Sequence, residues 1–159
     1  MNKNTYVSVL IQSLDKKIKV LDTIIQSNHM QKEALEDPNL DPDDFDRIVE
    51  KKSELIDELE RLDNGFEDIF ARVREELNAN RDAYREEIKV MQEYIRTITD
   101  KSVQVQKQEA QNKELMQQKF ASVRKQAREV RQSQKIVNQY YKNMMKANYT
   151  DPQFLDNKK

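Results

Sequence analysis

The residue types that most often carry out catalysis are scarce in this chain of 159 residues. It contains one histidine, His29, and no cysteine. A single histidine cannot form a zinc pair with another, and any nucleophile–His–acid arrangement would have to use this one ring. The absence of cysteine excludes disulfides, thiolate metal sites and cysteine catalysis. We therefore interpret His29 as a surface residue near the end of the first helix.

Acidic residues cluster in places, and their spacing decides whether they bind metal. Asp41, Asp43 and Asp44 resemble the start of a calcium loop, but the loop glycine and the spaced twelfth ligand are missing. The side chains of neighbouring pairs such as Glu75-Glu76 point in different directions on a helix, so we interpret them as separate, solvated charges. With one glycine the chain cannot form a glycine-rich phosphate loop. The sequence predicts a protein that is not an enzyme, with no metal, cofactor or small-molecule substrate.

The composition favours long helices with narrow apolar faces. Hydrophobic residues make up 36% of the chain and charged residues another 36%, so a thick globular core is excluded. One glycine and three prolines are too few for the turns of a β-protein. The apolar residues recur in steps of three and four, which argues against disorder. The expected fold is all-α, an elongated antiparallel helical bundle or coiled coil that forms one domain over residues 1–147.

Local signals predict where the helices begin and end. The first helix is expected over residues 5–36, because Asp37-Pro38 disfavours helix. The second is expected over 42–78, with Asp41 as N-cap and Pro42 in the first helical position. The third is expected over 81–147, with Asn80 as its cap. An alternative places the second turn at 97–102, where weak helix formers cluster. Residues 148–159 are expected to form a flexible polar tail.

The apolar positions follow one line along each of the first two helices. In the first helix they are Val7, Ile11, Leu14, Ile18, Leu21 and Ile25. In the second, Lys52 is the polar exception among apolar positions, which is acceptable if its ammonium reaches water. The line passes through Gly65 unchanged, which predicts a helical glycine where another backbone comes close. The rest of the second line is Phe45, Ile48, Leu55, Leu59, Leu62, Phe66, Ile69 and Val73.

A further apolar line runs through residues 116–144, in a segment whose other faces are basic. A third helix that packs beside the first two needs only about half of residues 81–147. The surplus either folds back as a fourth helix, protrudes and forms a homodimer, or binds a partner. We predict that its C-terminal part binds a protein partner, because Tyr and Met recur in surfaces that accept helices. The candidate partner-binding residues are Val123, Ala127, Val130, Val137, Tyr140, Tyr141, Met144 and Met145.

Charge is distributed unevenly along the chain, although the net charge is only −1. Residues 1–100 hold 24 acids and 15 bases, and residues 101–159 hold 5 acids and 13 bases. Acidic and basic helices that lie side by side explain this better than nucleic-acid binding, because the bases encircle their helix. No segment approaches the ~20 apolar residues of a transmembrane helix, so no membrane insertion and a cytoplasmic location are expected.

Four segments resemble the FlgN/FliT-like flagellar export chaperones. The run that begins Tyr6-Val-Ser-Val-Leu-Ile-Gln-Ser-Leu and the run that begins Ile48-Val-Glu-Lys-Lys-Ser-Glu-Leu are similar to the first two helices of that family. Gln108-Glu-Ala-Gln-Asn-Lys-Glu-Leu-Met resembles the polar part of its third helix, and Phe154-Leu-Asp-Asn-Lys-Lys resembles its tail.

The resemblance implies a cytoplasmic chaperone for type III flagellar export. Such a protein would bind the C-terminal helical segments of hook–filament junction proteins, prevent their premature assembly and aid their delivery to the export apparatus. The binding region of the family lies towards its C-terminus, where the candidate residues also lie. A structural coiled-coil adaptor or stalk component, built from two helices, is the main alternative. A nucleic-acid-binding helical protein is less favoured.

Overall fold

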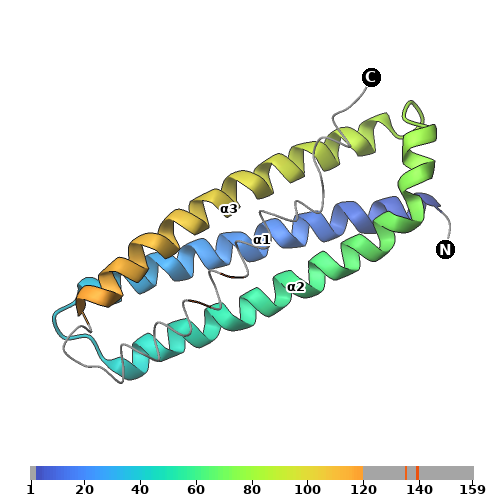
Figure 1. The fold of residues 1–159 in the computed structure, drawn as a ribbon. Helices are drawn as coiled ribbons and strands as arrows, with labels where there is room; N and C mark the ends of the chain where they lie inside the picture. Colours follow the sequence, from blue (N-terminus) through green and yellow to red (C-terminus); the bar gives the residue numbers. More distant parts are fainter. Residues whose placement is uncertain (1–2, 120–134, 136–138, 140–159) are drawn as a thin grey trace.

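The computed structural model describes residues 3–119 together with residues 135 and 139. Three long helices make up most of this part: α1 (Lys3–Glu36), α2 (Pro42–Ala79) and α3 (Arg85–Lys119). They run antiparallel to their neighbours in sequence and form an elongated bundle (Figure 1). No strand occurs among the described residues, so the predicted all-α bundle is confirmed. The predicted continuation of the third helix to residue 147, and the tail 148–159, lie outside the described residues.

The connection between α1 and α2 forms as its residues predict. α1 ends at Glu36, directly before Asp37-Pro38. The carboxylate of Asp41 accepts a hydrogen bond from the backbone N–H of Asp43 at 2.9 Å, so Asp41 is the N-cap of α2. Pro42 occupies the first helical position, where its missing N–H costs nothing. The acidic cluster at residues 41–44 is therefore the start of a helix.

The second turn lies at residues 80–84, near the predicted position, but Asn80 has a different role there. The backbone N–H and side-chain amide of Asn80 both donate to Glu76 O, at 3.0 and 3.2 Å. Asn80 thus caps the C-terminal end of α2 rather than starting α3, which begins later, at Arg85. An asparagine suits this place because its side chain can bond the last carbonyls of a helix, whose own partners are missing.

The alternative turn at residues 97–102 is wrong, because α3 runs through it without a break. The hydroxyl of Thr97 donates to Glu93 O at 3.0 Å, and that of Thr99 donates to Ile95 O at 2.9 Å. These bonds to the preceding turn satisfy the hydroxyls inside the helix. The residues at 97–102 have a weak intrinsic helix propensity, but the burial of Ile95, Ile98 and Ser102 on one face of α3 outweighs it.

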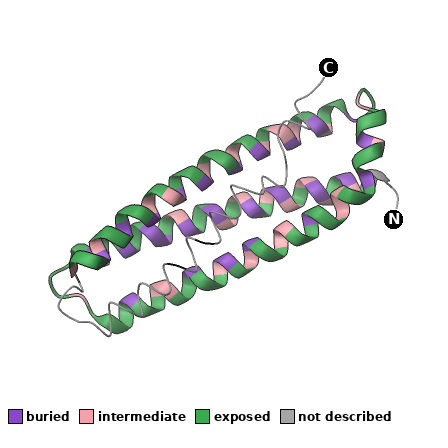
Figure 2. Cartoon of the chain, in the orientation of Figure 1, coloured by how far each residue is buried: buried purple, intermediate pink, exposed green. Residues whose placement is uncertain are grey.

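α1 lies between α2 and α3 and packs against both, whereas α2 and α3 approach one another far less (Figure 1). A helix with two neighbours needs a broad apolar face. The most buried line of α1 runs through Leu10 and Ile24, and the predicted Ile11, Ile18 and Ile25 are half-buried beside it. Figure 2 shows buried and intermediate positions along the length of α1. The main core combines residues of all three helices: Val7, Leu10, Leu14, Leu21, Ile24, Ile56, Leu59, Phe66, Val73, Leu77, Ile88, Met91, Ile95, Ile98 and Val105.

Gly65 lies in the interior of α2, which continues through it as predicted. The expectation that another backbone comes close there is wrong. A β-carbon built on Gly65 would meet no heavy atom within 4 Å, beyond its own helix backbone. The residue is exposed, and the neighbouring apolar positions Leu59 and Phe66 face the core without it. The packing of its neighbours therefore keeps α2 helical at Gly65, and no contact requires a glycine at this position.

Candidate functional site

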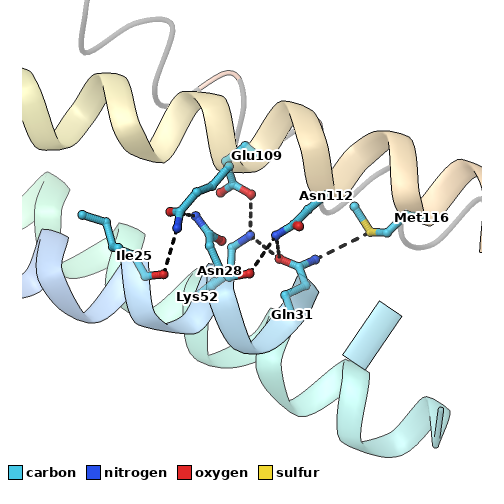
Figure 3. A network of polar contacts seen from close by, with 8 residues as sticks. Ile25, Asn28, Gln31, Lys52, Glu109, Asn112 and Met116 are labelled. Carbon is cyan, nitrogen blue, oxygen red and sulfur yellow. Dashed lines mark hydrogen bonds and ion pairs between the residues drawn. The ribbon is translucent and has the colours of Figure 1, made fainter. Parts of the chain in front are cut away.

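A network of polar side chains lies inside the bundle, toward the end where α1 turns into α2 (Figure 3). At its centre Lys52 of α2 donates to Glu109 Oε1 of α3 at 2.6 Å and to Gln31 Oε1 of α1 at 2.8 Å. Lys52 and Glu109 are each 1% exposed. All three helices therefore meet at one buried ammonium group.

Burial controls the protonation of this lysine. Loss of water disfavours the charged ammonium and lowers the pKa of Lys52 from its usual value of 10.5. The carboxylate of Glu109 acts in the opposite direction, through its charge and its hydrogen bond. The sequence-based expectation that the ammonium of Lys52 reaches water is wrong. It is instead held by an acid on another helix, which is how buried charges are usually accommodated.

Amides extend the network along the interface between α1 and α3. Asn112 Nδ2 donates to Asn28 O at 3.0 Å and to Gln31 Oε1 at 3.3 Å. Gln108 bridges the same helices, since its Nε2 donates to Ile25 O and its Oε1 accepts from Asn28 Nδ2, both at 3.2 Å. Directional polar contacts therefore hold this part of the interface, whereas the other end of the bundle is held by apolar packing.

A second buried lysine joins α1 to α2 nearer the middle of the bundle. Lys17 Nζ lies 2.6 Å from Asp63 Oδ1, and only 2% of the Lys17 side chain is exposed. Desolvation lowers the pKa of Lys17 from 10.5 to about 8, and the charge and hydrogen bond of Asp63 oppose this shift. The sequence reading missed Lys17, although it falls in steps of three and four between Leu14 and Leu21.

These two pairs position helices. Hydrogen bonds between charged groups inside a bundle are strong only at one relative offset and rotation of the helices. They therefore specify how α1, α2 and α3 align, whereas apolar side chains pack at several offsets. Across residues 3–119, 135 and 139, no group of acidic and histidine side chains is arranged to hold a metal ion.

The sequence contained a signal for this network. Lys52 interrupts the apolar line of the second helix, and Glu109 and Asn112 occupy apolar positions of the third. Polar residues at such positions fit a helical bundle when they face one another, so a cation and an acid in matching lines predict a pair. What the sequence lacks is the helix offset that brings Lys52 and Glu109 together.

The predicted partner-binding residues lie outside the described residues. This applies to Val123, Ala127, Val130, Val137, Tyr140, Tyr141, Met144 and Met145 alike. The structure does describe the point from which the segment continues. Lys119, the last residue of α3, donates from Nζ to Asp37 O at 2.7 Å, so α3 ends beside the turn between α1 and α2. Met116 belongs to the small core cluster at that end, with Leu35 and Phe45.

His29 lies on the surface, as predicted. Its side chain is 67% exposed, and Nε2 lies 3.9 Å from a carboxylate oxygen of Glu33 on the next turn. No hydrophobic helix long enough to cross a bilayer occurs in the part of the chain that the structure covers.

Comparison with known proteins gives one family. The sequence matches the FlgN protein family over residues 1–148, which is nearly its whole length. No curated protein and no solved structure matched the chain. The match agrees with the resemblance of the first three helical segments. The chain belongs to the FlgN family of flagellar export chaperones, whose partners are proteins of the export process.

Proposed function

We propose that this protein binds the C-terminal helical segments of hook–filament junction proteins in the cytoplasm. It keeps those segments from assembling prematurely and aids their delivery to the type III export apparatus. The match to the FlgN family over residues 1–148 is the observation that carries this proposal. The more specific part of the proposal, that the partners are hook–filament junction proteins, is supported by the sequence resemblance.

The partner-binding surface in this proposal is the apolar line on residues 116–144. Met116 is the last buried position of α3, and it continues the series Val105, Glu109 and Asn112 in steps of three and four. The sequence carries that spacing onward through Phe120, Val123, Ala127 and Val130. An apolar line of this kind accepts a partner helix that carries a matching line. In this proposal residues 1–147 act as one domain, with 148–159 as a polar tail.

The helix arrangement favours a chaperone over the two-helix adaptor. A stalk component needs one antiparallel pair, whereas here α1 has a neighbour on each side. The turn at residues 80–84 also starts a third helix whose last described residue lies at the α1–α2 end of the bundle. A further segment can therefore leave the bundle there and meet a partner.

The test uses purified full-length protein and synthetic peptides of hook–filament junction C-terminal helices. Val130→Asp and Val137→Asp each put a charge into the proposed contact. We expect peptide binding to weaken by about 2 kcal/mol or more in calorimetry, the scale of a hot-spot residue. The thermal midpoint of the free protein should change little. The matched control is Val103→Asp, because Val103 is an exposed valine on α3.

A different pattern would overturn the binding surface. If Val130→Asp lowers the thermal midpoint sharply and leaves affinity intact, the line is internal core, since burying a carboxylate is costly. Light scattering on the same samples tells whether the variant instead breaks a homodimer.

A further inference from the structure

A hollow of about 370 Å³ lies on the surface between α1 and α2, and its lining shares no residue with the proposed partner-binding line. Its floor and walls include Thr23, Ser27 and Met30 of α1 and Ile48 of α2. Arg47 and Lys51, one turn apart on α2, also line it. The hollow is open to solvent, so a side chain of another molecule can enter it.

The lining of the hollow is largely apolar, although it lies on the surface of the protein. Met30 is 52% exposed, and it and Val103 are the large hydrophobic side chains most exposed among the described residues. The hydroxyl of Thr23 is occupied, because it donates to Lys19 O at 3.0 Å, which leaves its methyl group for contact. An exposed apolar patch framed by polar residues is typical of a contact site. Methionine adapts its shape to different partners.

The charged residues that line the hollow are positive, whereas residues 1–100 as a whole carry a negative net charge. Its charged lining residues are Arg47 and Lys51, both exposed, and no acid of the part of the chain that the structure describes lines it. Residues 1–100 as a whole hold 24 acids against 15 bases. Arg47 pairs with Asp44 on its own helix, an exposed pair that a competing carboxylate can replace at little cost. Two cations beside an apolar hollow therefore select a partner with acids next to a large apolar side chain.

We propose that this hollow is a docking site for an acidic amphipathic helix of a protein partner. One large apolar side chain of that helix enters the hollow beside Met30 and Ile48, and flanking carboxylates pair with Arg47 and Lys51. Residues 120–147 of the chain itself do not fit, because they hold seven bases and one acid. This site goes beyond the proposed capture of export substrates by residues 116–144 and does not depend on it.

The probe is a synthetic helical peptide of about five turns, with leucine in steps of three and four and glutamate on both flanks. A sister peptide has lysine at each glutamate position. We expect the acidic peptide to bind the full-length protein at least about tenfold more tightly than the basic one, the equivalent of about 1.4 kcal/mol. Its affinity should fall as salt is raised, because exposed charges contribute to the contact.

Variants locate the site. Met30→Glu should weaken the acidic peptide about tenfold or more, since it places a like charge in the hollow. Lys51→Glu should weaken the acidic peptide and strengthen the basic one. Val103→Glu, at the other exposed hydrophobic position, is the matched control and should change neither. Because Met30 is half exposed, the thermal midpoint of Met30→Glu should stay near that of the wild type.

Several results would overturn the proposal. They are absence of acidic-peptide binding, equal binding of both peptides, or binding that Met30→Glu leaves unchanged. A Met30→Glu variant that only shifts the molar mass in light scattering would assign the hollow to a second copy of the chain instead. Val130→Asp should leave acidic-peptide binding intact, so failure of this site and failure of the proposed substrate-binding line are separate outcomes.

Discussion

Lys52 Nζ lies 2.6 Å from Glu109 Oε1, and this contact links α2 to α3 in a bundle where both helices pack mainly on α1. The two residues are 57 positions apart in the sequence. Both are fully enclosed, so each charge depends on the other for its solvation. The pair is therefore expected to matter more for the alignment of the helices than for the total free energy of unfolding.

Removing one member of this pair should be costly. Lys52→Met leaves the carboxylate of Glu109 buried opposite an apolar group, and we expect a loss of about 3–5 kcal/mol in the free energy of unfolding. The double variant Lys52→Met/Glu109→Met should recover most of that loss, because two apolar side chains of similar size need no partner. Urea unfolding measures both values. Lys51→Met, at the exposed neighbour, is the control. Equal losses in the single and double variants would contradict the pairing.

Stability should depend on pH through Lys17. Its pKa is lowered from 10.5 to about 8 by burial in the folded protein. Between these values the unfolded chain holds a proton that the folded chain has released, so the free energy of unfolding rises with pH. From about pH 7.5 to about pH 9.5 this single group should add about 2 kcal/mol.

The variant Lys17→Met should lack this rise, while Lys16→Met, at the exposed neighbour, should retain it. Urea unfolding at the two pH values supplies the comparison. A wild type and a Lys17→Met variant with the same pH dependence would show that Lys17 titrates as it does in water.

Replacing the one glycine should not harm the protein. In Gly65→Ala the new β-carbon meets no heavy atom within 4 Å outside its own helix backbone. Alanine also restricts the unfolded chain more than glycine does, so stability should stay the same or rise by up to about 1 kcal/mol. The reverse change at an exposed site of the same helix, Ala71→Gly, should lower stability by a similar amount. Clear destabilisation of Gly65→Ala in thermal unfolding would count against an uninterrupted α2.

The start of α2 depends on a single side chain. Asp41→Ala removes the carboxylate that accepts the N–H of Asp43, and about 1 kcal/mol of stability should be lost. Asp46→Ala removes an exposed acid of the same helix outside the cap and serves as the control. Thermal or urea unfolding of the two variants gives the difference. Equal effects would mean that general charge near the helix start, rather than the cap, stabilises it.

The ends of the helices could be read from the sequence where a local signal exists. Asp37-Pro38 stops α1 and Asp41-Pro42 starts α2, because these residues act on backbone groups within a few positions of themselves. The second turn was harder to predict. It lies close to the predicted position, but Asn80 caps the helix before it and α3 begins at Arg85 rather than at residue 81. The tolerance of Thr97 and Thr99 inside α3 depends on burial of their neighbours.

Polar residues in the apolar lines were visible in the sequence, and their partners were not. Lys52, Glu109 and Asn112 could be singled out by spacing alone, and the buried Lys17 was overlooked in the same kind of position. The hollow beside Met30 had no signal, since it needs residues from two helices.

The chain by itself determined the fold class, the family and most helix ends, because periodicity and capping act over a few residues. Only the tertiary structure decided that α1 occupies the middle of the bundle and that Lys52 meets Glu109 and Lys17 meets Asp63. These pairings depend on the offset and rotation of helices about 50 Å long. A shift of one turn, about 5.4 Å, would separate each pair while leaving the helical periodicity of the sequence unchanged.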